Sequence, residues 1–217
     1  MNTAENSRVL VLVRHGESEG NAENIFTGWI DRGLTRRGEE EARAVGRRFR
    51  DLGLVFDHVF VSMLGRTMAT ARLLIDELGT EPGDFRAAAD LDERDYGQLS
   101  GLNKDEARRR WGEEQVRQWR RSYAVSPPGG ESLRDVVARA APYYLRSILP
   151  LVLRGRKTLV VSHGNVLRAL TMAIEGYDPD AIQTIEYAPG EAVIYRLEAD
   201  ATVMTRERLP APDLDWR

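Results

Sequence analysis

VLVLVRHG, at residues 9–16, is a run of five β-forming apolar residues that ends at an arginine, a histidine and a glycine. An unbroken apolar run is typical of a strand buried on both faces in a parallel sheet. It delivers Arg14 and His15 to the carboxyl end of the strand, where α/β proteins place their reactive groups. TLVVSHGN, at residues 158–165, repeats the arrangement and delivers His163. Two of the three histidines therefore follow predicted buried strands.

The composition is that of one ordinary domain. The chain has 217 residues, 42% of them hydrophobic, and no low-complexity linker, so we expect a single domain over residues 1–217. It has no cysteine, which removes disulfides, thiol nucleophiles and thiolate metal sites. The short polar start and the brief first apolar run predict a cytoplasmic protein without a targeting signal or membrane span. The formal net charge of -3 disfavours a nucleic-acid binder, so an anionic ligand needs a local cluster of cations.

The alternation of strand and helix patterns indicates an α/β fold. We expect strands at residues 9–13, 58–62, 158–162 and 191–197, a weak edge strand at 86–91, and helices at 35–52, 66–78, 132–149 and 165–174. Short strand-to-helix connections are typical of a mostly parallel sheet. We therefore predict a three-layer sandwich: a mostly parallel central sheet flanked by helices. Residues 92–130 predict a helical insertion over the active site, Pro142 predicts a helix kink, and residues 206–217 predict an irregular tail.

Histidines and arginines at one edge of the sheet describe a phosphoryl site. Neutral imidazole is a nucleophile near neutral pH, and arginine presents a rigid fork of donors that matches phosphate oxygens. Helix N-termini just past the strands add N–H groups that face an anion. We infer that His15 attacks phosphorus to form a phosphohistidine. Three groups spread the charge of the transferred phosphoryl group: Arg14, Arg66 and His163.

Other interpretations of these residues fit the sequence less well. A zinc site normally needs three convergent ligands, and the arginines beside the histidines would repel a cation, so we expect no metal. His58 lacks the strand-end context and is expected to be structural. Phosphoryl transfer also needs a proton donor for the leaving oxygen. Glu93, in a polar loop, is the candidate, although composition alone favours a solvated surface charge there.

Several longer motifs span nearly the whole chain: LVRHGES at 12–18, FTGW at 26–29, GLNK at 101–104, WRR at 119–121 and HGN at 163–165. Together they resemble the cofactor-dependent phosphoglycerate mutases, members of the histidine phosphatase superfamily. The Arg-His-Gly motif alone would indicate only the superfamily, whereas the FTGW, GLNK and WRR motifs are more specific to mutases. The short segment at 128–131 resembles the compact bacterial form of these enzymes.

The resemblance implies roles for individual residues. It makes His15 the phosphorylated nucleophile and Glu93 the general acid and base. The remaining catalytic positions are Arg14, Arg66 and His163. The positions that would line the substrate site are Ser18, Asn21, Thr27, Gly28, Tyr96, Lys104, Arg120, Arg121, Gly164 and Asn165.

The implied activity is the interconversion of 3-phosphoglycerate and 2-phosphoglycerate in glycolysis and gluconeogenesis, primed by 2,3-bisphosphoglycerate, without a metal, in a homodimer or homotetramer. The alternative is a histidine phosphatase that hydrolyses small phosphoesters or phosphoproteins, because fold and nucleophile do not decide the acceptor. Lys104, Arg120 and Arg121 favour the mutase. The segment PGEA at 189–192 and the tail at 213–217 depart from the family pattern, so the phosphatase remains an alternative. A tail that closes over the site would exclude water from the phosphohistidine and favour the mutase. A non-catalytic phosphate-binding module would lack the nucleophile or the acid, and both are present.

Overall fold

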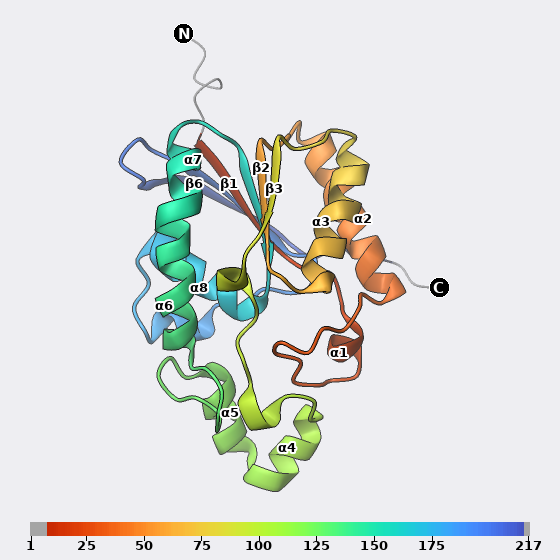
Figure 1. The fold of residues 1–217 in the computed structure, drawn as a ribbon, viewed down its shortest axis with the longest axis vertical. Helices are drawn as coiled ribbons and strands as arrows, with labels where there is room; N and C mark the ends of the chain where they lie inside the picture. The colour runs from red at the N-terminus through yellow and green to blue at the C-terminus, as the bar shows by residue number, and fades with distance from the viewer. Residues whose placement is uncertain (1–7, 215–217) are drawn as a thin grey trace.

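A six-stranded sheet forms the centre of the computed structural model, which describes residues 8–214 (Figure 1). The strand order is β3-β2-β4-β1-β5-β6. The strands are β1 (Arg8–Arg14), β2 (His58–Val61), β3 (Asp84–Ala87), β4 (Thr158–Ser162), β5 (Ala192–Leu197) and β6 (Val203–Leu209). The first four are parallel to one another, whereas β5 pairs antiparallel with β1 and with β6. The prediction of a mostly parallel sheet is confirmed.

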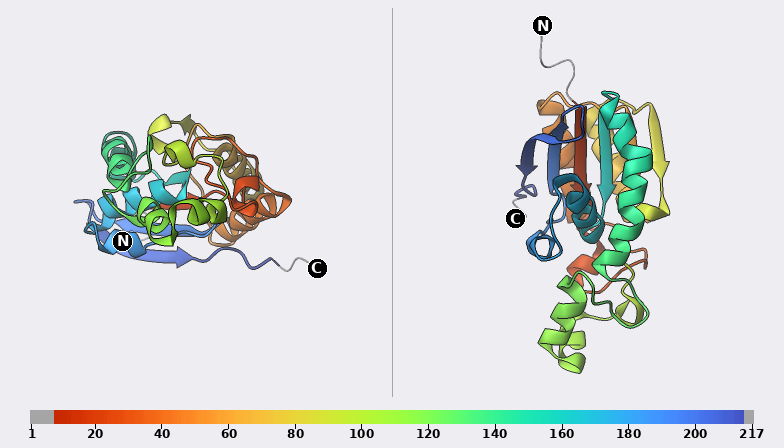
Figure 2. Two further views of the ribbon diagram at one scale, coloured as in Figure 1. Left: turned by 90° about the horizontal axis from the view of Figure 1, so that it is seen from below. Right: turned by 90° about the vertical axis from the view of Figure 1, so that its left-hand side faces the viewer.

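Helices cover both faces of the sheet, which confirms the three layers (Figures 1 and 2). One face is covered by α2 (Arg36–Asp51) and α3 (Gly65–Leu78), and the other by α6 (Leu133–Tyr143), α7 (Leu149–Leu153) and α8 (Gly164–Glu175). Successive side chains of β1 alternate between the two cores: Val9, Val11 and Val13 pack with α2 and α3, and Leu10 and Leu12 pack on the opposite side. The run at 9–13 is apolar throughout because both faces of its strand are buried.

The α-helical ladder of the long run on one face is interrupted just after Pro142, where the sequence predicts a kink. Proline lacks the N–H that would continue the helical ladder and crowds the preceding turn. A π-helical turn, η3 (Tyr144–Ile148), follows α6 directly and leads into α7. The run Leu133–Leu153 is long and apolar enough to cross a membrane by length and composition, and its buried side chains belong to the core beside α8.

The helical insertion lies beyond the carboxyl ends of the parallel strands (Figure 1). It contains the 3-10 turn η2 (Gly97–Leu99), α4 (Lys104–Trp111) and α5 (Glu113–Arg121). These elements pack with the loop after α1 (Glu19–Ala22) around a small core of their own, made by Phe26, Leu99, Ala107, Val116 and Trp119. The insertion is therefore held over the sheet edge at which His15 and His163 are delivered.

Two predicted segments differ from the structure. Residues 206–209, predicted as the start of an irregular tail, form the end of β6 and pair with β5. The sequence does not predict this strand because β6 is an edge strand whose side chains are mostly exposed and show no apolar alternation. Residues 210–214 have no regular structure, and 215–217 lie outside the described residues. The weak strand expected at 86–91 is β3, shifted to 84–87, and Ala89–Leu91 form a 3-10 turn, η1.

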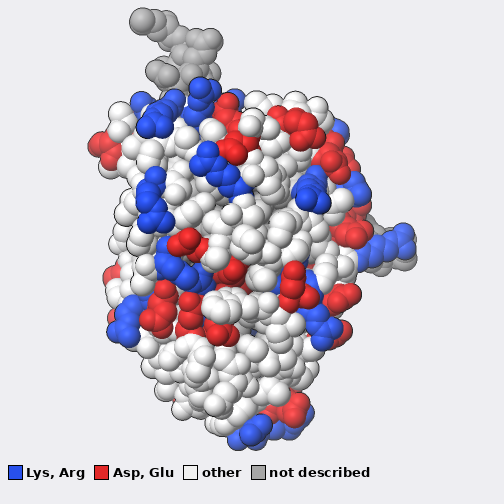
Figure 3. Space-filling model, in the orientation of Figure 1, with Lys and Arg blue, Asp and Glu red and all other residues white. Residues whose placement is uncertain are grey.

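Basic and acidic side chains alternate over the described residues on the face that Figure 3 draws. This distribution agrees with the small net charge of -3. The cations that could hold an anionic ligand line a pocket between the strand ends and the insertion.

Candidate active site

The two strand-end histidines meet because β1 and β4 are neighbours. In the register of this parallel pair Arg14 lies opposite Ser162, so His15 and His163 leave the sheet side by side. Their ring centroids are 5.0 Å apart. Glycine follows His15 because a Cβ at Gly16 would lie 2.1 Å from the carbonyl oxygen of Gly38 at the start of α2. The motif thus packs the strand end directly against a helix N-terminus.

His15 is held as a neutral ring with a defined proton. Its Nδ1 lies 2.7 Å from the carbonyl oxygen of Gly16. A carbonyl only accepts, so Nδ1 carries the hydrogen and Nε2 keeps its lone pair. Burial, together with the charges of Arg14 and Arg66, holds the pKa of His15 well below its usual range. The side chain is therefore a neutral imidazole with a nucleophilic Nε2 at neutral pH.

Three nitrogens near His15 are buried without a hydrogen-bond partner among the described residues: Arg14 Nε, Arg66 Nε and His163 Nδ1. Other nitrogens of the same side chains are anchored. Arg66 donates to the carbonyls of Gly28 at 2.8 Å and Ile30 at 3.1 Å. Buried polar groups are nearly always paired, so three unpaired nitrogens beside one nucleophile indicate a place for an anion.

His163 and the N-terminus of α8 complete the candidate anion site beside His15. The Nε2 of His163 lies 2.8 Å from the Oγ of Ser62, and the carbonyl of Tyr187 accepts from Arg14. Burial and the charge of Arg66 hold the pKa of His163 well below its usual range. His163 is the N-cap of α8 and makes no side-chain cap bond, so the first N–H groups of α8, from Gly164 on, remain available to an anion.

The loop that carries Glu93 is fastened from several sides. The Glu93 side chain accepts hydrogen bonds from the backbone N–H of Arg94 at 2.8 Å and from Nδ2 of Asn165 at 3.1 Å. Its carbonyl accepts from Nε1 of Trp29 at 2.6 Å and from Nη2 of Arg139 at 3.1 Å. Arg139 also forms two hydrogen bonds of 2.9 Å to Glu131. Glu93 is therefore a half-buried carboxylate held in a fixed loop.

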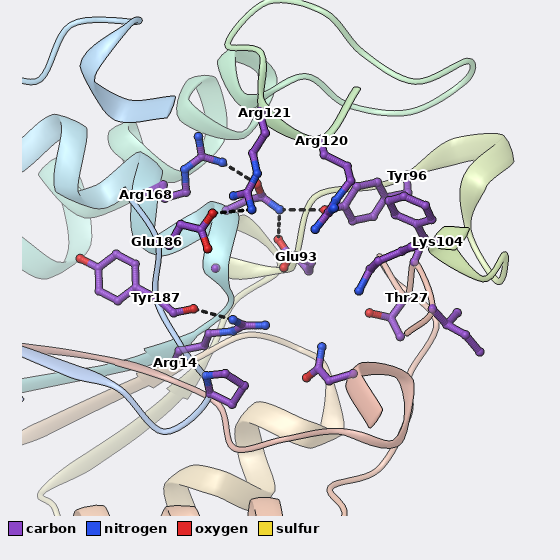
Figure 4. A pocket seen from close by; sticks show the side chains of 16 residues that line it. Arg14, Thr27, Glu93, Tyr96, Lys104, Arg120, Arg121, Arg168, Glu186 and Tyr187 are labelled. Carbon is purple, nitrogen blue, oxygen red and sulfur yellow. Dashed lines mark hydrogen bonds and ion pairs between the residues drawn. The ribbon is translucent and has the colours of Figure 1, made fainter. Parts of the chain in front are cut away.

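A pocket of about 310 Å³ opens between the strand ends and the insertion (Figure 4). Its lining residues are Arg14, Asn21, Ile25, Phe26, Thr27, Glu93, Tyr96, Lys104, Arg120, Arg121, Gly164, Asn165, Arg168, Glu186, Tyr187 and Pro189. Burial, then the charge of Arg120, lowers the pKa of Lys104, and burial lowers the pKa of Arg168 to about 10. The mutual repulsion of these cations favours an anionic ligand between them.

Ten of the fifteen predicted site residues line this pocket: Arg14, Asn21, Thr27, Glu93, Tyr96, Lys104, Arg120, Arg121, Gly164 and Asn165. His15, Arg66 and His163 are nearly fully buried next to lining residues. Ser18 and Gly28 lie elsewhere. Ser18 is the N-cap of α1 and bonds Asn21, so its hydroxyl supports a pocket residue. Gly28 has a φ of +51° and presents its carbonyl to Arg66.

Sequence reasoning missed several residues of the site. Arg168 lies one helical turn after Asn165 on α8 and donates to its Oδ1 at 3.2 Å, so the spacing of three could have revealed it. Glu186 and Tyr187 follow the 3-10 turn η4 (Ala181–Thr184) in a segment without periodicity, which carries no such signal. His58, expected to be structural, opens β2 and lies 3.4 Å from Asp84. Within residues 8–214 no group of three or more His, Cys, Asp or Glu side chains gathers as a metal site would require.

The amino-acid sequence is similar to proteins of a known family. The chain matches the family model described as histidine phosphatase superfamily (branch 1) over residues 10–209. It is similar to the 2,3-bisphosphoglycerate-dependent phosphoglycerate mutase of Beijerinckia indica subsp. indica, with 55% identity over 202 residues that cover 93% of this chain and 98% of that protein. The protein of the same name from Brucella anthropi is 55% identical over 207 residues, covering 94% and 100%.

Solved structures agree on the fold. Bacillus stearothermophilus YhfR superposes with a TM-score of 0.76 at 27% identity, over 90% of this chain and 93% of that one. A mycobacterial hydrolase superposes with a TM-score of 0.79 at 20% identity, over 95% and 100%, a likeness of fold alone. With the family match and the near full-length relatives, these findings show that the chain belongs to the histidine phosphatase superfamily and, within it, to the family of the 2,3-bisphosphoglycerate-dependent phosphoglycerate mutases.

Proposed function

We propose that this protein interconverts 3-phosphoglycerate and 2-phosphoglycerate through a phosphohistidine at His15. The observation that supports this most directly is the neutral Nε2 of His15 beside three buried nitrogens that have no partner among the described residues. Such donors match the equatorial oxygens of a transferring phosphoryl group. The names of relatives at 55% identity support the choice of substrate.

The proposed reaction keeps every proton and bond accounted for. Phosphorylated His15 donates to the free hydroxyl of 3-phosphoglycerate: the N–P bond breaks, an O–P bond forms, and Glu93 accepts the hydroxyl proton. After the doubly phosphorylated glycerate has turned, Nε2 of His15 takes the other phosphoryl group. Glu93 then returns the proton to the leaving oxygen, and 2-phosphoglycerate is released. Arg14, Arg66 and His163 hold the transferring phosphoryl group in both directions.

The residues present fit 2,3-bisphosphoglycerate as the primer. When bound, it supplies the phosphoryl group that first loads His15. The buried nitrogens near His15 suit one phosphate, and Lys104, Arg120 and Arg121 suit the carboxylate and the second phosphate. The side chains supply all the charge that this transfer needs, so we propose that no metal takes part.

A single assay tests the function. Isomerase flux and phosphate release from 3-phosphoglycerate are measured together, with and without trace 2,3-bisphosphoglycerate, in the presence of a chelator. We expect flux that is activated by the bisphosphate and exceeds phosphate release many-fold. Phosphate release without isomerisation would instead identify a phosphatase that shares His15, and neither activity would leave a phosphate-binding module.

Three further proposals remain: a cytoplasmic location, a single folding domain, which the composition favours, and assembly as a homodimer or homotetramer, which the resemblance implies. Sedimentation velocity at several protein concentrations tests the assembly, because a self-associating chain sediments as a dimer or tetramer. One cooperative transition in calorimetry would support the single domain.

A further inference from the structure

Glu186 is a carboxylate in a pocket that mainly collects cations. Among residues 8–214, five basic side chains line this pocket, and Glu186 is one of only two acidic lining residues, the other being Glu93. Figure 4 shows its carboxylate pointing at Arg121, with which it forms an ion pair. A carboxylate at this position disfavours binding of an anionic ligand in two ways. It repels the ligand, and it pairs with a guanidinium that would otherwise bind the ligand.

The backbone that carries Glu186 is anchored within the site. The carbonyl of Ile182 accepts from Arg168 at 3.1 Å and 3.2 Å, and the carbonyl of Tyr187 accepts from Arg14. The carbonyl of Glu186 itself accepts from Arg208. This segment therefore contacts three of the five basic lining residues, Arg121 included, and its backbone is fixed beside the pocket.

The ion pair between Glu186 and Arg121 is accessible and exchangeable. The side chain of Glu186 is 63% exposed and that of Arg121 is 32% exposed. Pairs exposed to this degree contribute little stability, so a ligand anion with several charges can replace the carboxylate at Arg121. The free-energy cost of displacing the carboxylate from Arg121 depends on the negative charge of Glu186.

We propose that Glu186 is a specificity-determining residue that competes with ligands for Arg121 and weakens binding of the doubly phosphorylated glycerate more than binding of a singly phosphorylated one. The inference rests on the proposed function. Repulsion by Glu186 grows with the charge of the ligand, and the bisphosphate carries one phosphate more. The residue thereby limits how tightly the pocket holds the species from which His15 must take a phosphoryl group.

The test is the substitution Glu186→Gln, which keeps the size of the side chain and removes its charge. Dissociation constants for 2,3-bisphosphoglycerate and 3-phosphoglycerate are measured by titration calorimetry. We expect the first to fall about tenfold and the second about threefold, so that their ratio changes about threefold. The matched control is Glu40→Gln, which removes a carboxylate paired with Arg47 on α2, outside the pocket, and should leave the ratio unchanged.

A second variant separates competition for Arg121 from repulsion at a distance. In an Arg121→Gln background the competition is absent, so adding Glu186→Gln should tighten bisphosphate binding by less than half as much as it does in the natural chain, on a logarithmic scale. A full gain in that background, an unchanged ratio, or weaker binding of both ligands by Glu186→Gln would overturn the proposal. Isomerisation by the natural chain is measured alongside, so these results are distinguished from failure of the proposed function itself.

Discussion

The floor of the site and its rim are built by different means. The floor, defined by His15, Arg66 and His163, is at most 3% exposed and is positioned by the sheet, by α3 and by buried hydrogen bonds. The rim, defined by Lys104, Arg120, Arg121 and Glu186, is half-buried or exposed and stands on the insertion and on the segment after η4. Groups fixed in advance stabilise a transition state, whereas mobile surface charges mainly select ligands. Changes in the floor should therefore alter chemistry, and changes in the rim should alter binding.

The sharpest test of this division is His15→Asn. Without the imidazole no phosphohistidine forms, so we expect isomerase flux to fall by about 10⁴-fold or more. Because the rim is untouched, the dissociation constant for 3-phosphoglycerate should change by only about threefold. A coupled isomerase assay and titration calorimetry measure the two quantities, and the far-ultraviolet circular dichroism of the variant checks its fold. Substantial turnover by this variant would contradict a floor that performs the chemistry.

The floor is also the part that the sequence predicts best. Its signal is local, since an apolar run and the Arg-His-Gly motif are contiguous, and two such runs in one parallel sheet end at the same edge. The three cations of the rim are predicted only through the resemblance of motifs, because Lys104 and Arg121 come together through the packing of α4 and α5 around Phe26 and Trp119. Glu186 was missed since only tertiary packing brings its segment to the pocket. β6 was missed for a related reason: pairing of its backbone with β5 determines it, whatever its side chains.

Arg139 fastens the loop of Glu93 beside the floor and gives the next largest effect. It holds the carbonyls of Asp90 and Glu93 and pairs with Glu131, so Arg139→Gln should let the loop of Glu93 move. Because a displacement of about 1 Å can cost about 10²-fold in rate, we expect kcat to fall by about 10- to 100-fold with little change in KM. Steady-state kinetics measure this split.

Two further variants make the effect of Arg139 specific. Arg139→Lys keeps the charge without the planar fork and should restore only part of kcat. Arg134→Gln, on an exposed position of the same helix α6, should behave like the natural chain. Equal losses of kcat in the variants at 134 and 139 would show that general damage to α6, and not the loop of Glu93, is responsible.

Within the rim, Lys104→Gln should raise KM for 3-phosphoglycerate about tenfold and change kcat by less than about threefold. Burial and nearby arginines lower the pKa of Lys104, so its charge is costly in the empty pocket and is compensated when an anion binds. Arg109→Gln removes a charge from an exposed position of the same helix α4, outside the pocket, and serves as the control. A fall in kcat comparable to that of the Arg139 variant would erase the distinction between floor and rim.

The smallest effect concerns the pH dependence of stability and again belongs to the floor. Burial and Arg66 lower the pKa of His163 well below the value of 6.5 that it has in the unfolded chain. Below pH 6.5 the His163 side chain therefore binds a proton in the unfolded state but not in the folded state, so the free energy of unfolding decreases as the pH falls. We expect the natural chain to lose about 1 kcal/mol more than His163→Gln between pH 6.5 and 5.5. Urea unfolding at both pH values measures the difference, and comparison with the variant removes the carboxylates, such as Glu41, whose raised pKa acts in the opposite direction. Equal losses of stability in the two proteins would mean that folding does not lower the pKa of His163. The floor would then not be a dry, preorganised site, and this difference between the floor and the rim would disappear.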